Sequence, residues 1–109
     1  MSMQADYRKE REGVETIEGE FGFIAYKLFP EECYIVDIYV VPGLRRAKIA
    51  TEMANEVALI AKNNKCKILT SSVDTRLASS SESAMALFGY GMRFLRTEGS
   101  VVFFYKEVG

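Results

Sequence analysis

The sequence predicts a mixed α+β fold, approaching a three-layer α/β arrangement, in which a mainly antiparallel sheet contains one central βαβ crossover. Residues 13–41 alternate β-branched and aromatic runs with short turn signals, a pattern typical of an antiparallel meander. Apolar residues then recur at helical spacing from Ile49 to Ile60. A strand-like run follows at residues 66–70, and two strands joined by such a helix lie parallel with a right-handed crossover.

The individual elements follow from the same patterns. Strands are expected at residues 5–10, 13–17, 21–28, 33–41 and 66–70, and a hairpin at residues 93–96 and 101–107. Helices are expected at residues 44–63 and 82–90, with residues 71–83 as a polar loop. In the second helix, Ala84, Leu87 and Phe88 are expected to face inward.

Length and composition exclude several classes of protein. The 109 residues suit a single domain over residues 1–109. The net charge of −1 offers no basic excess for general nucleic-acid binding. The longest apolar runs, 84–88 and 101–105, are too short to span a membrane, so no membrane partner is expected. The polar N-terminus has no signal-peptide core, which favours a cytoplasmic protein.

The cysteine and histidine content limits the chemistry. Cys33 and Cys66 are the only cysteines and there is no histidine, so a zinc site would lack its usual ligands and no metal is expected. Both cysteines are interpreted as reduced core thiols. Without histidine, acid–base chemistry must use a carboxylate, a tyrosine, a thiol or relayed water.

The stretch VDIYVVPGLRRAKIA, residues 36–50, combines a strand, a turn and the start of a helix. Arg45, Arg46 and Lys48 crowd the expected helix start, where free N–H groups point outward and the helix dipole is already positive. Cations there are unfavourable unless an anion binds beside them. A phosphate-bearing ligand is therefore one interpretation, and a solvated basic turn is the other.

Residues 37–42, followed by Arg45 and Ala50, resemble motif A of the GNAT superfamily of N-acetyltransferases. That motif runs aspartate, aliphatic, aromatic, valine, any residue, proline, two further residues and then Arg/Gln-x-x-Gly-x-Gly/Ala. Arg45 falls on the Arg/Gln position, Ala50 on the Gly/Ala position and Lys48 on the first glycine. In the family this glycine lets the backbone close on the pyrophosphate of acyl-CoA. Lys48 is a departure, because a lysine must direct its side chain elsewhere or replace a backbone contact with a charged one.

The resemblance, which covers roughly Gly13 onward, implies the GNAT acyl-CoA N-acyltransferase fold in a minimal, divergent form. The strand ending at Val41 and the strand near Cys66 would splay apart, so that backbone groups at residues 38–41 could bond the pantetheine amides. The family's N-terminal helix pair, one wall of the acceptor site, is expected to be missing, leaving the acceptor side open or completed by a partner chain. The acyl-CoA-binding residues so implied are Ile38, Tyr39, Val40, Val41, Arg45, Arg46, Ala47, Lys48, Ile49, Ala50, Ser81 and Phe88.

The resemblance also suggests catalytic candidates. In the family's Asn-x-x-Ala-x-x-Leu-Tyr helix the tyrosine is the general acid toward the leaving thiolate; here Ser81 takes the asparagine position and Phe88 the tyrosine position. Phe88 cannot donate a proton. Tyr90 is a candidate substitute, and its alternative interpretation is an amphipathic tyrosine at a helix end.

The base is sought on the strand before the turn. Tyr34 occupies the position where some relatives carry a glutamate base, and Glu32 is a nearby carboxylate, so both are candidates. The alternative for Tyr34 is a packed strand tyrosine. Asp37 is interpreted as a structural residue that accepts backbone or side-chain hydrogen bonds.

The resemblance implies an acyl-CoA-dependent N-acyltransferase, in which a primary amine attacks the thioester of acetyl-CoA, or another acyl-CoA, directly in a ternary complex. A backbone amide near Val40 would polarise the carbonyl. An open acceptor side favours a protein or peptide amine. The alternative is a catalytically degenerate GNAT-fold binding or interaction module, a homodimer that covers the aromatic strand 101–105. Otherwise these aromatic residues fill the core.

Overall fold

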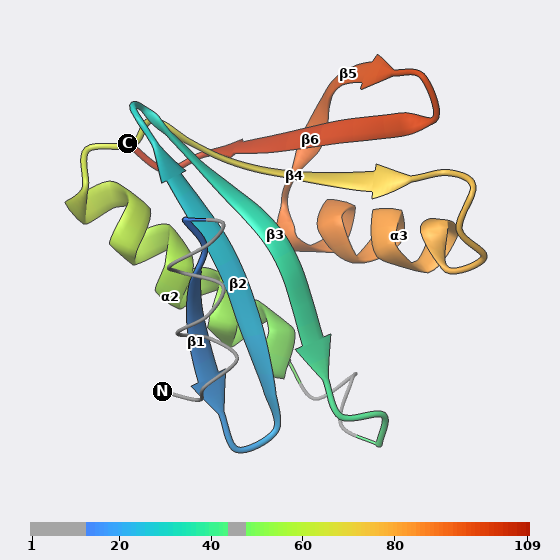
Figure 1. The fold of residues 1–109 in the computed structure, drawn as a ribbon, viewed down its shortest axis with the longest axis horizontal. Helices are drawn as coiled ribbons and strands as arrows, with labels where there is room; N and C mark the ends of the chain where they lie inside the picture. The colour runs from blue at the N-terminus through green and yellow to red at the C-terminus, as the bar shows by residue number, and fades with distance from the viewer. Residues whose placement is uncertain (1–12, 44–47) are drawn as a thin grey trace.

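A computed structural model describes residues 13–43 and 48–109, which form a six-stranded sheet with two helices on one side (Figure 1). The strand order is β1-β2-β3-β4-β6-β5, and only the β3–β4 pair is parallel. The predicted mixed sheet with a βαβ crossover is confirmed; the strand expected at residues 5–10 lies outside the described residues. The strands are β1 Glu15–Gly19, β2 Gly22–Phe29, β3 Glu32–Val40, β4 Ile68–Asp74, β5 Arg93–Glu98 and β6 Val101–Glu107, and the helices are α2 Ile49–Asn63 and α3 Ser80–Tyr90.

The first three strands form the predicted meander. β1 and β2 are joined directly by a turn at Glu20 and Phe21, with no helix between them. The register between β2 and β3 shifts once, because Ala25 lies opposite Asp37 whereas Tyr26 lies opposite Ile35. Val36 is therefore an extra residue, a β-bulge that bends β3 and changes the direction of its side chains.

β3 and β4 are joined over a short length and then separate. Their parallel pairing is limited to Glu32 with Ile68, Cys33 with Leu69 and Tyr34 with Thr70. Beyond these pairs the two strands diverge (Figure 1), as the splay expected between them requires. The sheet therefore has an opening in its middle, between a half formed by β1–β3 and a half formed by β4, β5 and β6.

Helix α2 crosses between the two parallel strands and covers the first half of the sheet. Its buried stripe of Met53, Ala54, Val57 and Ala61 joins the main hydrophobic core. The helix was expected to begin at residue 44, but α2 begins at Ile49, because Lys48 has φ 64°, a left-handed conformation. Residues 44–47 lie outside the described residues. A right-handed helix cannot continue through a residue with positive φ.

The strand β4 is longer than its sequence suggested. Residues 71–74 were expected in a polar loop, but they continue the strand. Leu69, Ser71 and Val73 alternate toward the buried face, and the buried hydroxyl groups of Thr70 and Ser71 are satisfied by hydrogen bonds across to β3. Polar residues can therefore continue a buried strand when their hydrogen-bonding groups find partners.

The aromatic strand β6 is internal. It pairs with β5, which confirms the expected hairpin, and with β4 on its other side, so this strand needs no second copy of the chain to cover it. Phe104 is buried in the core, which agrees with the alternative that these aromatic residues fill it. β5 forms the edge instead. In the described ranges, no helix is long and apolar enough to cross a lipid bilayer.

Candidate functional site

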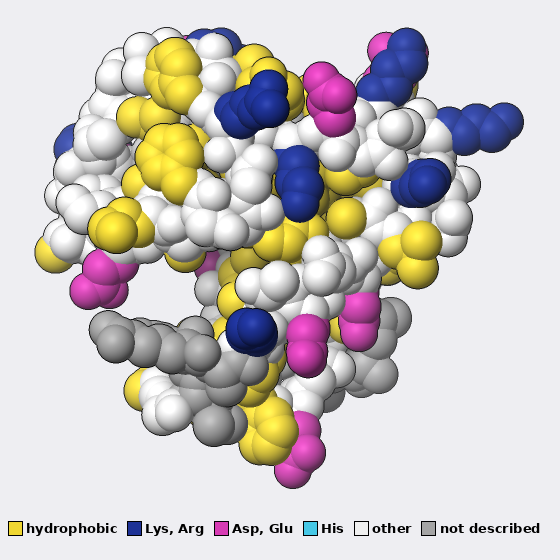
Figure 2. Space-filling view, turned by 180° about the vertical axis from the view of Figure 1, so that it is seen from behind, with side chains coloured by type: hydrophobic (Ala, Val, Ile, Leu, Met, Phe, Trp, Pro, Cys, Tyr) yellow, Lys and Arg dark blue, Asp and Glu magenta, His cyan; other side chains and the backbone are white. Residues whose placement is uncertain are grey.

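A pocket of about 340 Å³ opens where β3 and β4 separate. Its walls come from both strands, from Ala50 in the first turn of α2, and from α3. Seen from behind, the molecule is hollowed on the side where the two halves separate (Figure 2). The lining residues are Ile35, Val36, Asp37, Ile38, Val40, Ala50, Ser71, Ser72, Val73, Glu82, Ser83, Ala86 and Leu87.

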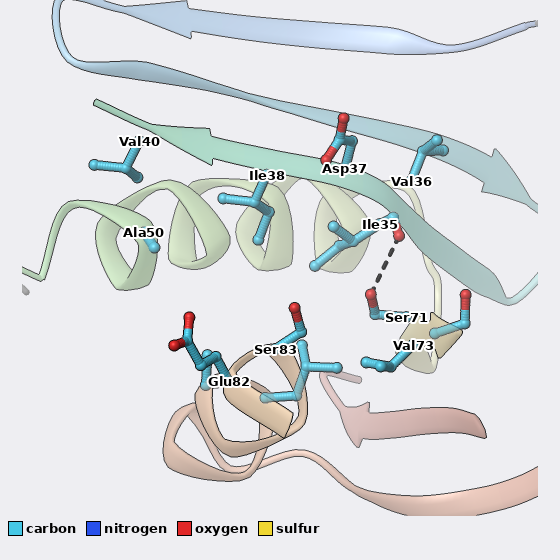
Figure 3. Close-up of a pocket in the computed structure, with 13 residues that line it drawn as sticks. Ile35, Val36, Asp37, Ile38, Val40, Ala50, Ser71, Val73, Glu82 and Ser83 are labelled. Atoms are coloured by element: carbon cyan, nitrogen blue, oxygen red, sulfur yellow. Dashed lines mark hydrogen bonds between the residues drawn. The ribbon is translucent and has the colours of Figure 1, made fainter. Parts of the chain in front are cut away.

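The pocket has an apolar interior with polar groups at its margins (Figure 3). Ile35 and Ile38 point from β3 into the space between that strand and α3, while Glu82 and Ser83 project from α3 toward it. Asp37 points to the opposite side of β3. The pocket therefore borders residues that belong to both faces of the sheet.

Side-chain hydrogen bonds hold β3 to β4 at the closed end of the pocket. The buried Thr70 hydroxyl donates to Glu32 Oε2 at 2.7 Å. The hydroxyls of Tyr34 and Ser72 lie 2.5 Å apart, and either can donate. The bond from Thr70 to Glu32 lies within the segment where the two strands pair, and the contact of Tyr34 with Ser72 extends the connection one residue beyond the last pair on β4.

Ser71 contacts the first backbone carbonyl beyond that pairing. Its hydroxyl donates to the Ile35 carbonyl oxygen at 3.3 Å, the bond drawn in Figure 3. Because this distance is long for a hydroxyl donor, the bond is weak and a better-placed donor can replace it. The pocket therefore offers a carbonyl acceptor to an extended ligand that lies between the strands.

A second pocket, also of about 340 Å³, continues from the first. The two share Ile35, Ile38, Ala50, Ala86 and Leu87, and the second extends to Lys48 and Tyr90. Together they form a groove from the strand opening, past the start of α2, to the end of α3. An elongated molecule suits this shape better than a compact one.

Tyr90 is held at the end of this groove by contacts with two other elements. Its hydroxyl donates to Asn55 Oδ1 of α2 at 2.8 Å. Lys106 Nζ lies 4.2 Å from the ring centroid and donates to the Tyr90 carbonyl oxygen at 3.1 Å. Burial raises the pKa of the Tyr90 hydroxyl, so it stays protonated at neutral pH.

Lys48 retains the backbone conformation of a glycine. Its φ of 64° lies in the left-handed region, which glycine adopts without steric penalty and other residues rarely do. Its side chain is exposed and makes no cap hydrogen bond to α2. At the position where motif A has its first glycine, this chain keeps the glycine-like backbone and adds an ammonium group beside the groove.

The structure brings together only part of the expected binding set. Ile38, Val40, Lys48, Ala50 and Tyr90 line one or both pockets. Other expected residues lie elsewhere: Glu32, Tyr34, Tyr39, Val41, Ile49, Ser81 and Phe88 line neither pocket, and Arg45, Arg46 and Ala47 lie outside the described residues.

Two of these placements correct specific expectations. Phe88 does not face inward: it is 53% exposed and packs edge-on against Phe104, with ring centroids 5.1 Å apart. The Asp37 carboxylate accepts no hydrogen bond from any described residue, although it was expected to be structural. Asp37 lies opposite Ala25 of β2, whose side chain has no hydrogen-bond donor.

Sequence reasoning missed the polar groups of the pocket. Ser71 and Ser72 were assigned to a loop, although the alternation of Leu69, Ser71 and Val73 was a signal for a half-buried strand. Glu82 and Ser83 are one and two residues beyond Ser81, and only the orientation of α3 shows that they face β3. In the part of the chain that the structure describes, no three His, Cys, Asp or Glu side chains gather to hold a metal ion.

Comparison with known proteins shows the family of this chain. The model of the acetyltransferase (GNAT) family matches residues 15–90, which is more than half of the chain. The chain therefore belongs to the GNAT acetyltransferase family. No curated protein sequence matches it.

Several solved structures share the fold. The PaiA N-acetyltransferase of Thermoplasma acidophilum, crystallised with coenzyme A, matches with a TM-score of 0.76 and 17% identity over 96% of this chain and 68% of that one. A GNAT acetyltransferase of Elizabethkingia anophelis with acetyl-CoA bound matches with a TM-score of 0.73 and 17% identity over 97% of this chain and 83% of that one. A putative GNAT acetyltransferase from Desulfovibrio desulfuricans matches with a TM-score of 0.76 and 12% identity over 95% of this chain and 76% of that one. At these identities the likeness concerns the fold alone.

Proposed function

We propose that residues 1–109 form one GNAT-type domain that transfers an acetyl group from acetyl-CoA, or a related acyl group from its acyl-CoA, to a primary amine. The observation that carries this proposal is the groove that begins where β3 and β4 separate and passes the start of α2. Two relatives by fold were crystallised with coenzyme A or acetyl-CoA, which supports a ligand of this kind.

The shape and chemistry of the groove fit an acyl-CoA. The pantetheine arm is a narrow, extended chain with two amide groups, and an opening between two strands suits such a chain. An amide N–H of the arm can replace Ser71 at the Ile35 carbonyl. The pyrophosphate then lies near the start of α2, where Lys48 supplies a cation and the backbone N–H groups favour an anion.

Acyl transfer in this site is a direct displacement. The neutral amine nitrogen attacks the thioester carbonyl carbon, the carbon–sulfur bond breaks and the thiolate leaves with its electron pair. The proton lost by the amine nitrogen balances the proton gained by the sulfur. Holding the amine and the thioester together supplies much of the rate enhancement.

Tyr90 is the candidate general acid for the thiolate. It is protonated at neutral pH and lines the groove, although its hydroxyl is directed to Asn55. Glu32 and Tyr34 act indirectly: Glu32 holds the paired segment of β3 and β4 through Thr70, and Tyr34 holds the point where the strands begin to separate through Ser72. An open acceptor side suits an amine on a protein or peptide.

Calorimetric titration with acetyl-CoA tests the proposal. Wild-type protein should bind in the micromolar range, and Ala50→Leu should weaken binding at least tenfold because Ala50 lines both pockets. Glu56→Leu is the matched control, since it places the same side chain at an exposed position on α2 outside both pockets. Absence of binding by folded wild-type protein at millimolar acetyl-CoA would exclude the transferase.

The second candidate is a catalytically degenerate GNAT-fold interaction module that forms a homodimer. It is favoured by exposed apolar side chains. Met85 is 73% exposed, and more than half of the surface is exposed both for Phe88, whose ring contacts Phe104, and for Phe94, which pairs with Phe104 across β5 and β6. Figure 2 shows hydrophobic side chains gathered over the half that holds α3 and β5. Sedimentation analysis of wild-type protein and of Met85→Ser/Phe94→Ser would detect self-association through this surface.

A further inference from the structure

We infer that β5 pairs antiparallel with β5 of a second copy of this chain, in a register that places Arg93 opposite Glu98 of that copy. This inference rests on the second candidate of the proposed function, the homodimer, and names the strand, the register and the charges through which the two copies meet. It does not depend on acyl transfer.

β5 has a free edge. It ends the strand order of the sheet, and among the described residues it pairs only with β6 (Figure 1). All six of its residues are exposed. The backbone N–H and C=O groups along such an edge can pair with another strand. A strand from a second copy would supply these partners and join the two sheets into one.

A bulge brings two opposite charges to one face of this edge strand. Arg93 and Glu98 lie five positions apart, so in a regular strand they would point to opposite faces. The shift of register between Phe94 and Arg96 adds one residue and brings both charges to the face away from α3. Phe94 lies on the other face, where it pairs with the buried Phe104.

This arrangement is complementary to itself under two-fold symmetry. Two identical neighbouring strands related by a two-fold axis that passes between them run antiparallel, and each contact occurs twice. When the axis passes between Leu95 and Arg96, each Arg93 lies opposite Glu98 of the other copy, and each Phe94 lies opposite Thr97. The dimer then contains two Arg–Glu pairs on one face. On the other face it covers Phe94, which is 56% exposed in the single chain.

The remaining charge of the strand does not oppose this pairing. The Arg96 guanidinium lies 4.5 Å from the ring centroid of Phe103 on β6, and its Nε lies 3.3 Å from Glu98 Oε2. Arg96 is therefore turned toward β6 and away from the free edge, so the two copies do not bring this charge together. Arg93 forms no ion pair with a described residue, and Glu98 keeps its second carboxylate oxygen for the Arg93 of the other copy.

Charges and a bulge on an edge strand can also prevent pairing between molecules. That protection depends on repulsion, which a row of charges of one sign provides. In β5 both signs occur, in an order that self-pairing makes complementary. A six-residue edge buries less than the roughly 1,200–2,000 Å² of a standard interface, so we expect a weak dimer that forms at micromolar concentrations.

Sedimentation equilibrium at low salt, over a range of protein concentrations, tests the register. Arg93→Glu and Glu98→Arg each turn both Arg–Glu pairs into like-charge pairs, so each variant alone should raise the dissociation constant of the dimer about tenfold. An equimolar mixture of the two variants has opposite charges at both positions and should associate about as tightly as wild type. Glu56→Arg, the same charge change as Glu98→Arg at an exposed position on α2, should dimerise like wild type.

The outcomes separate this inference from the proposed function. Wild-type protein that stays monomeric at millimolar concentration would overturn both the inference and the homodimer. If wild type and both single variants dimerise equally well, the copies meet through another surface, so the inference is wrong and the homodimer remains. If each variant is monomeric and their mixture is monomeric too, the register is wrong.

The transferase is tested independently on the same proteins. No residue of β5 lines either pocket, so acetyl-CoA should bind Arg93→Glu and Glu98→Arg as tightly as it binds wild type. Absence of acetyl-CoA binding by all of these proteins would exclude the transferase and leave the dimer standing. Loss of acetyl-CoA binding in the variants alone would contradict a role of β5 that is limited to its free edge.

Discussion

Replacement of Lys48 by glycine should affect stability and ligand binding in opposite directions. Lys48 has φ 64°, where the Cβ atom of any residue other than glycine is crowded. Relief of that crowding is worth about 1–2 kcal/mol, and the greater freedom of glycine in the unfolded chain removes about 0.5–1 kcal/mol of it. We therefore expect Lys48→Gly to be more stable than wild type by roughly 0.5–1 kcal/mol.

The same substitution removes the only described lysine that lines the groove. If its ammonium contacts the phosphates of acyl-CoA, the affinity should fall about fivefold at low salt, and the loss should shrink at high salt because the contact is exposed. Urea denaturation measures the gain in stability. Calorimetric titration with acetyl-CoA at low and at high salt measures the loss of affinity.

Lys65 provides a matched control. It also has φ 64°, and it lies in the turn after α2, outside both pockets. Lys65→Gly should stabilise the protein by a similar amount and leave acetyl-CoA affinity unchanged. Equal or tighter binding of acetyl-CoA by Lys48→Gly would refute the charged contact, and a loss of stability in both variants would refute the argument from backbone strain.

Three further results are expected. Gly22→Ala should destabilise the protein by more than about 1 kcal/mol in urea denaturation, because the added Cβ would lie 2.1 Å from the Tyr39 carbonyl oxygen of β3. Gly89→Ala, where the added Cβ would meet open space, should stabilise the protein by roughly 0.5–1 kcal/mol. Equal effects of the two substitutions would contradict this argument. Burial raises the pKa of Cys33 to about 12, so the contribution of this neutral thiol to the free energy of unfolding is fully present below the unfolded pKa near 9 and is lost as pH rises toward 12. Because both thiols are buried, neither Cys33 nor Cys66 should react with a thiol reagent at pH 8 until urea unfolds the protein. Glu82→Gln should tighten acetyl-CoA binding about twofold to threefold, because it removes a negative charge from the pocket. It should also lower the free energy of unfolding by about 0.3–1 kcal/mol, because Glu82 lies in the first turn of α3, where a negative charge is favourable. Weaker binding of acetyl-CoA by this variant would contradict binding of the anionic ligand in this pocket.

The order of strands and helices could be predicted because it depends on periodicity. The buried stripe of α2 and the aromatic and β-branched strands carry that signal in the sequence. The start of α2 could not be predicted, because it depends on the dihedral angle of Lys48, and a lysine gives no sign of a left-handed conformation. The end of β4 was missed because Ser71 is stabilised in a buried strand by a carbonyl from another strand.

The candidate site was predictable only where it follows the motif. Ala50 and Lys48 line the groove at the positions that the motif indicated. The side of β3 on which Asp37 lies depends on the bulge at Val36, and a one-residue shift of this kind changes which side chains face the pocket. Such a shift is set by pairing with β2, so the sequence of β3 alone does not reveal it.

The short junction between β3 and β4 also has a consequence for how the molecule opens and folds. Each half of the sheet is held by its own antiparallel ladders. Among the described residues, the two halves are joined by three parallel backbone pairs, by the crossover helix and by side-chain hydrogen bonds such as Thr70 to Glu32 and Tyr90 to Asn55. We expect amide hydrogen exchange to show two cooperative units, one on either side of that seam. A molecule bound across the seam would act as a clamp, slowing exchange in both units at once and making the protein stiffer than its free form.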